Sequence, residues 1–260
     1  MGVVDLKKML VLDLDGTLLN SQKQIDKITI EAINKAKKYV NEIVIASGRG
    51  HESINNFYKD MGLEGFKIAL NGSYVMDNQN EILYANFIKG SVLEAALNLA
   101  LKYKVKIFFT GINEHIYFNQ NAGDYSVSEI KEIVGQSKER FLKFSMDVSK
   151  LTELNELRAD LDKLSLNISL SDEGHFEVTN YGISKITGIN YLAEKMNIEL
   201  SDIIAIGDSE NDLAMLKEVG TSVAMGNATE EVKNISEYIT KTNNNFGVAY
   251  FLNKYFKEKK

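Results

Sequence analysis

The first third of the chain alternates short apolar runs with stretches of helical periodicity. Residues 9–14, 42–46 and 67–70 are mostly apolar and predict three strands. Residues 26–39 and 51–61 carry apolar side chains at helical spacing and predict the helices between them. The run EIVIA at 42–46 shows no alternation, which is typical of a strand buried on both faces. Strands that alternate with helices predict a parallel, doubly wound sheet.

The last third of the chain returns to this pattern. Residues 202–206 and 222–225 predict strands, and helices are predicted at 184–196, 211–218 and 246–256. We therefore expect one core built from both ends of the chain.

The middle of the chain has a different pattern. Its strands are longer and come in pairs, such as VKIFFT with HIYFN, which predict antiparallel hairpins. The predicted order from 91 to 179 is helix, two strands, helix, strand, helix, two strands. The fold class is therefore α/β, with a doubly wound parallel-sheet core at 1–82 and 183–260. An inserted α+β domain is expected at 83–182.

Composition and charge exclude several function classes. The 260 residues include no cysteine, so disulfides, thiolate metal sites and a cysteine nucleophile are ruled out. The net charge of −6 gives no electrostatic case for binding nucleic acid or a membrane. We find no signal-peptide pattern and no apolar run of transmembrane length, and we expect a cytoplasmic protein. The expected oligomeric state is a monomer or a weak dimer.

Polar motifs follow four of the predicted strands. They are DLDGT from residue 13, SGR from 47, NG from 71 and GDSEND from 207. Because the carboxyl ends of parallel strands meet at one edge of a sheet, these motifs should converge there. The carboxylates brought together would be Asp13, Asp15, Asp208 and Asp212. Four carboxylates in one crevice need a cation, and ligation by oxygen alone suits Mg²⁺.

These motifs resemble those of a known family. DLDGT, SGR, the downstream Lys185, GDSEND and the AMGNA of residues 224–228 are together similar to the haloacid dehalogenase superfamily of phosphohydrolases. The insertion between SGR and Lys185 resembles the Cof-type sugar-phosphate phosphatase branch, with its large α/β cap. The resemblance covers nearly the whole chain.

The resemblance implies a role for each catalytic residue. Asp13 would attack phosphorus and form an aspartyl-phosphate. Asp15 would act as general acid and then as general base, and we expect Asp13 to raise the pKa of Asp15 toward neutrality. Ser47 would hydrogen-bond a phosphoryl oxygen, and Lys185 would neutralise charge on the nucleophile and the transferring group.

The resemblance also implies a metal site and a set of substrate contacts. Mg²⁺ would be held by the Asp13 carboxylate, the Asp15 backbone carbonyl and Asp208. Asp212 would either bind the metal through water or orient Asp208. The substrate-binding candidates are Gly16, Gly48, Arg49, Asn71, Gly72 and Asn211. Some of these residues also have a simpler interpretation. Arg49 could form an ion pair at the surface, and Asn71 and Gly72 could form an ordinary turn.

The inserted domain would serve as a cap over the site. A cap excludes water from the nucleophile and selects the leaving group. Its candidate specificity residues are Asn113, His115, Tyr117, Arg140 and Lys143. The predicted function is a Mg²⁺-dependent phosphatase of small phosphorylated metabolites, sugar phosphates among them. The alternatives are a phosphotransferase or mutase of the same superfamily and a catalytically silent metabolite-binding protein.

Overall fold

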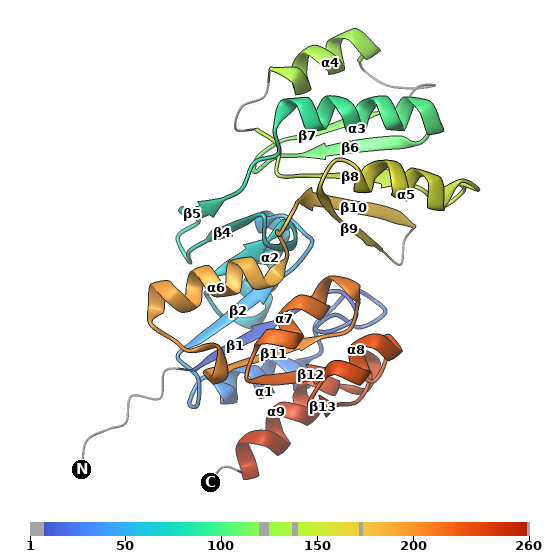
Figure 1. The fold of residues 1–260 in the computed structure, drawn as a ribbon. Coiled ribbons are helices and arrows are strands. Elements are labelled where there is room, and N and C mark those ends of the chain that lie inside the picture. The colour runs from blue at the N-terminus through green and yellow to red at the C-terminus, as the bar shows by residue number, and fades with distance from the viewer. Residues whose placement is uncertain (1–7, 120–124, 137–139, 172–173, 259–260) are drawn as a thin grey trace. The chain divides into compact units, whose positions relative to one another are not determined.

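The computed structural model describes residues 8–119, 125–136, 140–171 and 174–258 and divides the chain into two compact units (Figure 1). The core unit consists of Met1–Tyr84 and Ser184–Lys260, and the inserted unit of Ala85–Ile183. The predicted fold class is confirmed, because a largely parallel sheet lies in the first unit and an antiparallel sheet in the second. None of the helices in the described ranges combines the length and the apolar character needed to cross a bilayer.

The core unit is built on an eight-stranded sheet. Its strands are β1 (Met9–Leu12), β2 (Glu42–Ala46), β3 (Lys67–Ala69), β4 (Tyr74–Met76), β5 (Ile82–Ala85), β11 (Ile203–Gly207), β12 (Thr221–Ala224) and β13 (Tyr238–Ile239). They lie in the order β13-β12-β11-β1-β2-β3-β4-β5. All pairings from β13 to β3 are parallel, whereas β4 is antiparallel to β3.

Six helices described in the core unit accompany its parallel strands along the chain. They are α1 (Lys27–Ala36), α2 (His51–Met61), α6 (Lys185–Met196), α7 (Leu213–Glu218), α8 (Glu230–Ile235) and α9 (Gly247–Glu258). Single 3₁₀ turns are η1 (Leu70–Gly72), η2 (Leu200–Asp202), η3 (Glu210–Asp212) and η4 (Asn243–Asn245). The predicted helices and strands of this unit are present, with ends shifted by at most three residues. Four elements have no counterpart among the predicted ones, because they are too short for a clear periodicity: β4, β5, β13 and α8.

The two central strands mark the point where the chain changes direction across the sheet. From β1 the chain adds β2 and β3 on one side, and later β11, β12 and β13 on the other. Every residue of β1 and β11 is buried, as expected for strands with helices on both faces. In open α/β sheets, ligands bind beyond the carboxyl ends of the strands at such a switch point.

The inserted unit contains a five-stranded antiparallel sheet and three helices. The strands are β6 (Lys106–Thr110), β7 (His115–Phe118), β8 (Lys143–Asp147), β9 (Leu166–Leu170) and β10 (His175–Asn180), in the order β7-β6-β8-β10-β9. The helices are α3 (Gly90–Tyr103), α4 (Val127–Gly135) and α5 (Leu154–Asp162). The amphipathic pattern of residues 149–162 predicts a helix over that whole range. The helix begins only at Leu154, because the Ser149 hydroxyl and N–H both donate to Asp147 Oδ1 and hold a turn there.

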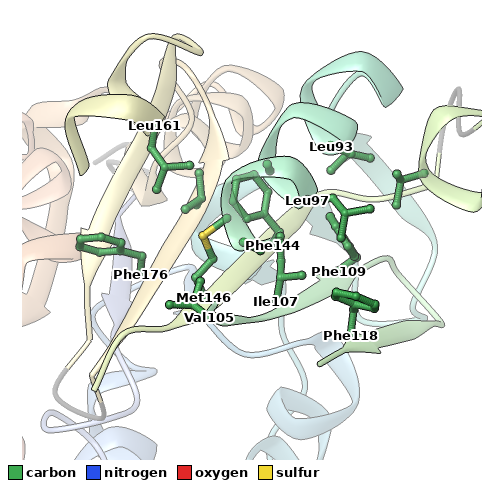
Figure 2. Close-up of a cluster of buried hydrophobic side chains, with 14 of the residues drawn as sticks. Leu93, Leu97, Val105, Ile107, Phe109, Phe118, Phe144, Met146, Leu161 and Phe176 are labelled. Atoms are coloured by element: carbon green, nitrogen blue, oxygen red, sulfur yellow. The ribbon is translucent and has the colours of Figure 1, made fainter. Parts of the chain in front are cut away.

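One face of this sheet carries the apolar core of the inserted unit. Figure 2 shows Phe109, Phe144 and Phe176 from three strands beside Leu97 of α3 and Leu161 of α5. All five side chains are almost completely buried. Alternate residues of the strands face away from this core, so the sheet has one apolar and one more polar face.

The cap candidates occupy varied positions in the inserted unit. Asn113, His115 and Tyr117 are exposed in or near β7. The Arg140 guanidinium forms an ion pair with Glu114 at 2.7 Å. Lys143 is nearly buried and its ammonium lies 2.7 Å from the Glu177 carboxylate. A role for any of these residues in specificity stays a prediction.

Candidate active site

Loops from four parallel strands form the carboxyl edge of the core sheet. Asp13 follows β1, Ser47 follows β2, Asn71 follows β3 and Asp208 follows β11. Main-chain hydrogen bonds tie these loops together beyond the strands, since Asp13 N–H donates to Ile206 O at 3.1 Å. Asn71 N–H donates to Ser47 O at 2.9 Å. The motifs that are far apart in the sequence are thus neighbours in the structure.

Lys185, the first residue of α6, is the buried cation of the site. Its Nζ lies 2.5 Å from Asp13 Oδ1 and 2.7 Å from Asp212 Oδ1. Burial alone lowers the pKa of Lys185, but the two carboxylates outweigh it and hold the pKa above its ordinary value. Lys185 is therefore a charged ammonium, although its side chain is completely buried.

Asp13 has one engaged oxygen and one without a partner. Oδ1 accepts from Lys185, whereas the buried Oδ2 accepts no hydrogen bond from any residue that the structure describes. Burial raises the pKa of Asp13, Lys185 lowers it and Asp212 raises it, with a result of about 7. A buried acceptor of this kind is rare in folded proteins and marks a place for a ligand or ion.

Asp208 faces the same interior. Thr17 Oγ1 donates to its Oδ1 at 2.9 Å, and Asn227 Nδ2 lies 3.5 Å from its Oδ2. Burial and the repulsion from Asp13 raise the pKa of Asp208 to about 8. The site therefore holds two carboxyl groups whose ionised forms are both disfavoured.

Asp212 is held by the loop that carries Asp208. Its Oδ2 accepts the main-chain N–H of Asp208 at 2.9 Å and that of Ser209 at 3.1 Å. Its Oδ1 accepts from Lys185. Since both oxygens are engaged by protein donors, Asp212 fixes the position of Asp208 and of Lys185.

These residues fit a divalent cation. Ligand oxygens of Asp13, Asp208 and Asp212 lie within 4.8 Å of one another in buried positions. The unpartnered Oδ2 of Asp13 and the raised pKa values of two carboxyl groups are both expected where a cation compensates buried negative charge. An all-oxygen donor set is the kind that Mg²⁺ prefers.

Two of the predicted substrate-binding glycines are required by the packing of the site. Gly16 has a φ of +81°, and a Cβ there would lie 2.1 Å from Asp208 Oδ2. Gly72 has a φ of +92°, and a Cβ there would lie 2.0 Å from the carbonyl oxygen of Ser184. Each glycine therefore allows a close approach that any side chain would block.

Asp15 lies in a different environment from the one expected. Both of its oxygens accept from the Arg49 guanidinium at 2.7 Å, and Lys23 Nζ lies 2.8 Å from Oδ1. Burial raises the pKa of Asp15, but the hydrogen bonds from Arg49 and Lys23 outweigh it and lower the pKa to about 2. The expectation that Asp13 raises the pKa of Asp15 is therefore wrong in this structure. Arg49 thus forms an ion pair, as in the alternative given for it above. The pair is partly buried, because only 32% of the Arg49 side chain is exposed.

The remaining predicted residues line the neighbouring loops. Ser47 is buried, and its Oγ accepts the main-chain N–H of Arg49 at 3.2 Å, with Gly48 between them. Asn211 Nδ2 donates to Asn71 Oδ1 at 3.1 Å and so joins the loops after β3 and β11. These are contacts within the protein, so the predicted contacts to substrate stay a proposal.

Three residues that contact the site have no role predicted from the sequence: Thr17, Lys23 and Asn227. Thr17 and Asn227 lie inside the quoted motifs DLDGT and AMGNA, which offered a signal for both. Asn227 also donates to the carbonyl oxygen of Gly16 at 2.9 Å. Lys23 lies outside every motif, and nothing in the sequence indicated its contact with Asp15.

Comparisons with known proteins agree with this geometry. The family model of haloacid dehalogenase-like hydrolases matches residues 10–252. The 5-amino-6-(5-phospho-D-ribitylamino)uracil phosphatase YcsE of Bacillus subtilis is 30% identical over 245 residues, which cover 93% of each chain. The pyridoxal phosphate phosphatase YbhA of Escherichia coli is 27% identical over 265 residues, covering 94% of this chain and 97% of its own.

A solved structure shows the same likeness. A haloacid dehalogenase-like hydrolase from Bacteroides thetaiotaomicron superposes with a TM-score of 0.77 at 28% identity, covering 96% of this chain and 100% of the other. The match of the family model over nearly the whole chain confirms the resemblance drawn from the motifs. The chain belongs to the haloacid dehalogenase-like hydrolases.

Proposed function

We propose that the protein is a Mg²⁺-dependent phosphatase that hydrolyses small phosphorylated metabolites through an aspartyl-phosphate on Asp13. The observation that carries this proposal is the environment of the Asp13 carboxylate. It is buried at the end of a central strand, with one oxygen on Lys185 and the other without a hydrogen-bond partner among the described residues. A carboxylate held in this way has one oxygen oriented by a cation and one able to attack.

In the first step, an oxygen of Asp13 attacks phosphorus. The bond from phosphorus to the leaving oxygen breaks as the bond to Asp13 forms, and the leaving oxygen takes a proton from Asp15. In the structure Asp15 is ionised and bound to Arg49 and Lys23. To act as the acid, Asp15 must give up the contacts of Oδ1 with Lys23 and Arg49 Nη2 and take up a proton there, while Oδ2 can still accept from Arg49 Nε and orient the carboxyl group.

In the second step, a water oxygen attacks phosphorus and gives a proton to Asp15. The bond between phosphorus and Asp13 breaks, so inorganic phosphate leaves and the carboxylate is restored. Lys185 holds Asp13 and offsets negative charge throughout. The Ser47 hydroxyl accepts from Arg49 N–H, which leaves its own proton to donate to a phosphoryl oxygen.

The proposed metal site consists of the Asp13 and Asp208 carboxylates and the backbone carbonyl of Asp15, with Asp212 orienting Asp208. When bound, Mg²⁺ would offset the charge of the carboxylates and of the phosphoryl group. The proposal is supported by the buried acidic cluster and by the raised pKa values of Asp13 and Asp208.

The proposed substrates are phosphate monoesters of small metabolites, with sugar phosphates as the first class to test. The two curated relatives are named for a ribityl phosphate and for pyridoxal phosphate, which differ widely in their leaving groups. We assign the choice of leaving group to the inserted unit acting as a cap. In support, the first of these relatives matches over 93% of this chain and so over the inserted unit too.

The test is release of phosphate from p-nitrophenyl phosphate by the whole chain, with Mg²⁺ and with a chelator. We expect turnover only with Mg²⁺, and none by Asp13→Asn. The matched control is Asp202→Asn, which changes an exposed carboxylate of η2 and should leave activity unchanged. If Asp13→Asn protein is as active as the parent, the proposal is wrong. Phosphate found on an added sugar, rather than free in solution, would instead identify a phosphotransferase.

A further inference from the structure

Tyr74, the first residue of β4, makes two hydrogen bonds to His51 that the reaction above does not use. Its Oη accepts the main-chain N–H of His51 at 2.8 Å and lies 3.1 Å from His51 Nδ1. Tyr74 is completely buried, and His51 is 9% exposed. The contact joins residues 23 positions apart in the interior of the core unit.

The protonation states of the two side chains suit both bonds. Burial raises the pKa of Tyr74 to about 12, so its phenol stays neutral near neutral pH. Burial also lowers the pKa of His51, which favours the neutral imidazole. The Tyr74 hydroxyl accepts the main-chain N–H of His51, and its second hydrogen bond joins it to His51 Nδ1, with the donor set by the imidazole tautomer.

These bonds fix the start of α2. The helix begins at His51, and its N-cap is Gly50, which has no side chain to cap the first amides. The hydroxyl of Tyr74 satisfies one of these amides from a different element. The main chain just before α2 is the loop from Ser47 to Gly50, so Tyr74 holds the end of that loop.

Two further links to this loop come from the turn just before Tyr74. Leu70 N–H donates to Arg49 O at 3.1 Å, and Asn71 N–H donates to Ser47 O at 2.9 Å. The φ angles of Leu70, Asn71 and Gly72 are +47°, +57° and +92°, three successive left-handed residues. A left-handed conformation at two non-glycine residues persists only where the surroundings hold it.

We propose that Tyr74 is a positioning residue for the reaction, which holds the Ser47–Gly50 loop so that Arg49 reaches Asp15. This inference rests on the proposed function. Tyr74 touches none of the reacting groups, and its effect passes through the main chain of His51 and Arg49. Arg49 then contacts Asp15 through both Nε and Nη2 at 2.7 Å. Loss of the hydroxyl should loosen the loop while leaving the aromatic ring in place.

The test compares Tyr74→Phe with Tyr58→Phe in the whole chain. Tyr58 is also buried and lies in α2, the helix that begins at His51. Its hydroxyl bonds main-chain groups of Ile45, Ile43 and Phe66 at 2.8 to 3.0 Å. We expect Tyr74→Phe to lower kcat for p-nitrophenyl phosphate by about 3- to 10-fold with KM unchanged, the scale of one hydrogen bond. Tyr58→Phe should lower the melting temperature at least as much and leave kcat unchanged. Equal kcat values for parent and Tyr74→Phe would overturn the proposal.

A double-mutant cycle tests whether Tyr74 affects kcat through Arg49. In an Arg49→Ala background, Tyr74→Phe should cause no further loss, because the residue through which it acts is gone. The same fold loss in both backgrounds would overturn the assignment.

A measurement on the unchanged protein needs neither a variant nor turnover. Hydrogen exchange followed by NMR should give similar protection factors for the His51 amide and for Arg49 Nε–H, because both depend on the same opening of the loop. A protected His51 amide beside an unprotected Arg49 Nε–H would contradict the positioning role. An inactive parent enzyme would count against the proposed function, and these protection factors would still decide the positioning role.

Discussion

The ammonium of Lys185 lies 2.5 Å from Oδ1 of Asp13, and neither side chain has more than 6% of its surface exposed. The same ammonium contacts Asp212 at 2.7 Å, so one cation serves two buried carboxylates. A triad of this kind is stable only as a whole, because removing one partner leaves uncompensated charge in the interior.

Replacement of Lys185 by methionine should therefore damage both stability and catalysis. We expect Lys185→Met to lower the free energy of unfolding by about 3–5 kcal/mol, since Asp13 and Asp212 then lack their cation. Activity should fall by about 10²- to 10³-fold, the scale seen when one charge-stabilising group is lost from an active site. Urea denaturation and phosphate release measure the two effects. The control is Lys195→Met in the same helix, where the side chain is exposed and both quantities should be unchanged.

Substitution of Gly16 by alanine tests the packing around Asp208. The new Cβ would lie 2.1 Å from Asp208 Oδ2, so the carboxylate must move. We expect Gly16→Ala to need more Mg²⁺ for half-maximal activity and to lower maximal activity. Gly62→Ala is the matched control, because Gly62 also has a positive φ, +64°, with nothing within 4 Å of the added carbon. It should lose about 1–2 kcal/mol of stability, the cost of a side chain at a left-handed residue, and keep the Mg²⁺ dependence of the parent. Equal Mg²⁺ dependence in the two variants would contradict the placement of Asp208 in the metal site.

In the presence of a chelator, and so without bound metal, the free energy of unfolding should fall as pH rises from about 4 to about 8. The pKa of Asp13 is raised from 3.8 to about 7 and that of Asp208 to about 8, in both cases chiefly by burial. At a pH between 3.8 and these raised pKa values, the two carboxyl groups keep their protons in the folded protein but have lost them in the unfolded chain. Folding is therefore favoured at the lower pH. The effect of Asp15 on stability changes with pH in the opposite direction. Its pKa is lowered to about 2, so its contribution to stability is lost only in more acid solution.

Two comparisons connect this pH dependence to the acidic cluster. Asp208→Asn should flatten the fall, because one of the two titrating carboxyl groups is gone. Added Mg²⁺ should stabilise the protein more at high pH than at low pH, since metal and protons compete for the same oxygens. Free energies of unfolding from urea titrations supply both results. If the free energy of unfolding measured with a chelator rises between about pH 4 and about pH 8, the carboxyl groups of Asp13 and Asp208 do not titrate as described.

Much of the site could be predicted because its residues lie where strands end. Apolar runs locate the strands, and parallel pairing brings the residues that follow them to one edge of the sheet. For that reason Asp13 and Asp208 were expected to meet across 195 positions, and β1 and β11 are indeed neighbours. Lys185 depended on the family resemblance, because a lysine at the start of a helix has no distinctive pattern of its own.

The environment of Asp15 could not be predicted in the same way. Sequence spacing placed it beside Asp13, whereas its pKa is governed by Arg49 and Lys23. Arg49 lies 34 positions away and reaches Asp15 only because of how the loop after β2 is folded. The roles of Tyr74 and Asn227 depend likewise on tertiary hydrogen bonds that leave no periodic signal in the chain.

Phosphorylation of Asp13 during turnover can be tested directly by trapping the aspartyl-phosphate. The enzyme is mixed with p-nitrophenyl phosphate and Mg²⁺, quenched in acid within the first turnovers, digested and analysed by mass spectrometry. We predict the added mass of one phosphoryl group on the peptide that contains Asp13, and its absence in Asp13→Asn protein or with a chelator. A phosphoryl group on another residue, or turnover that persists in Asp13→Asn protein, would show that Asp13 is not the nucleophile.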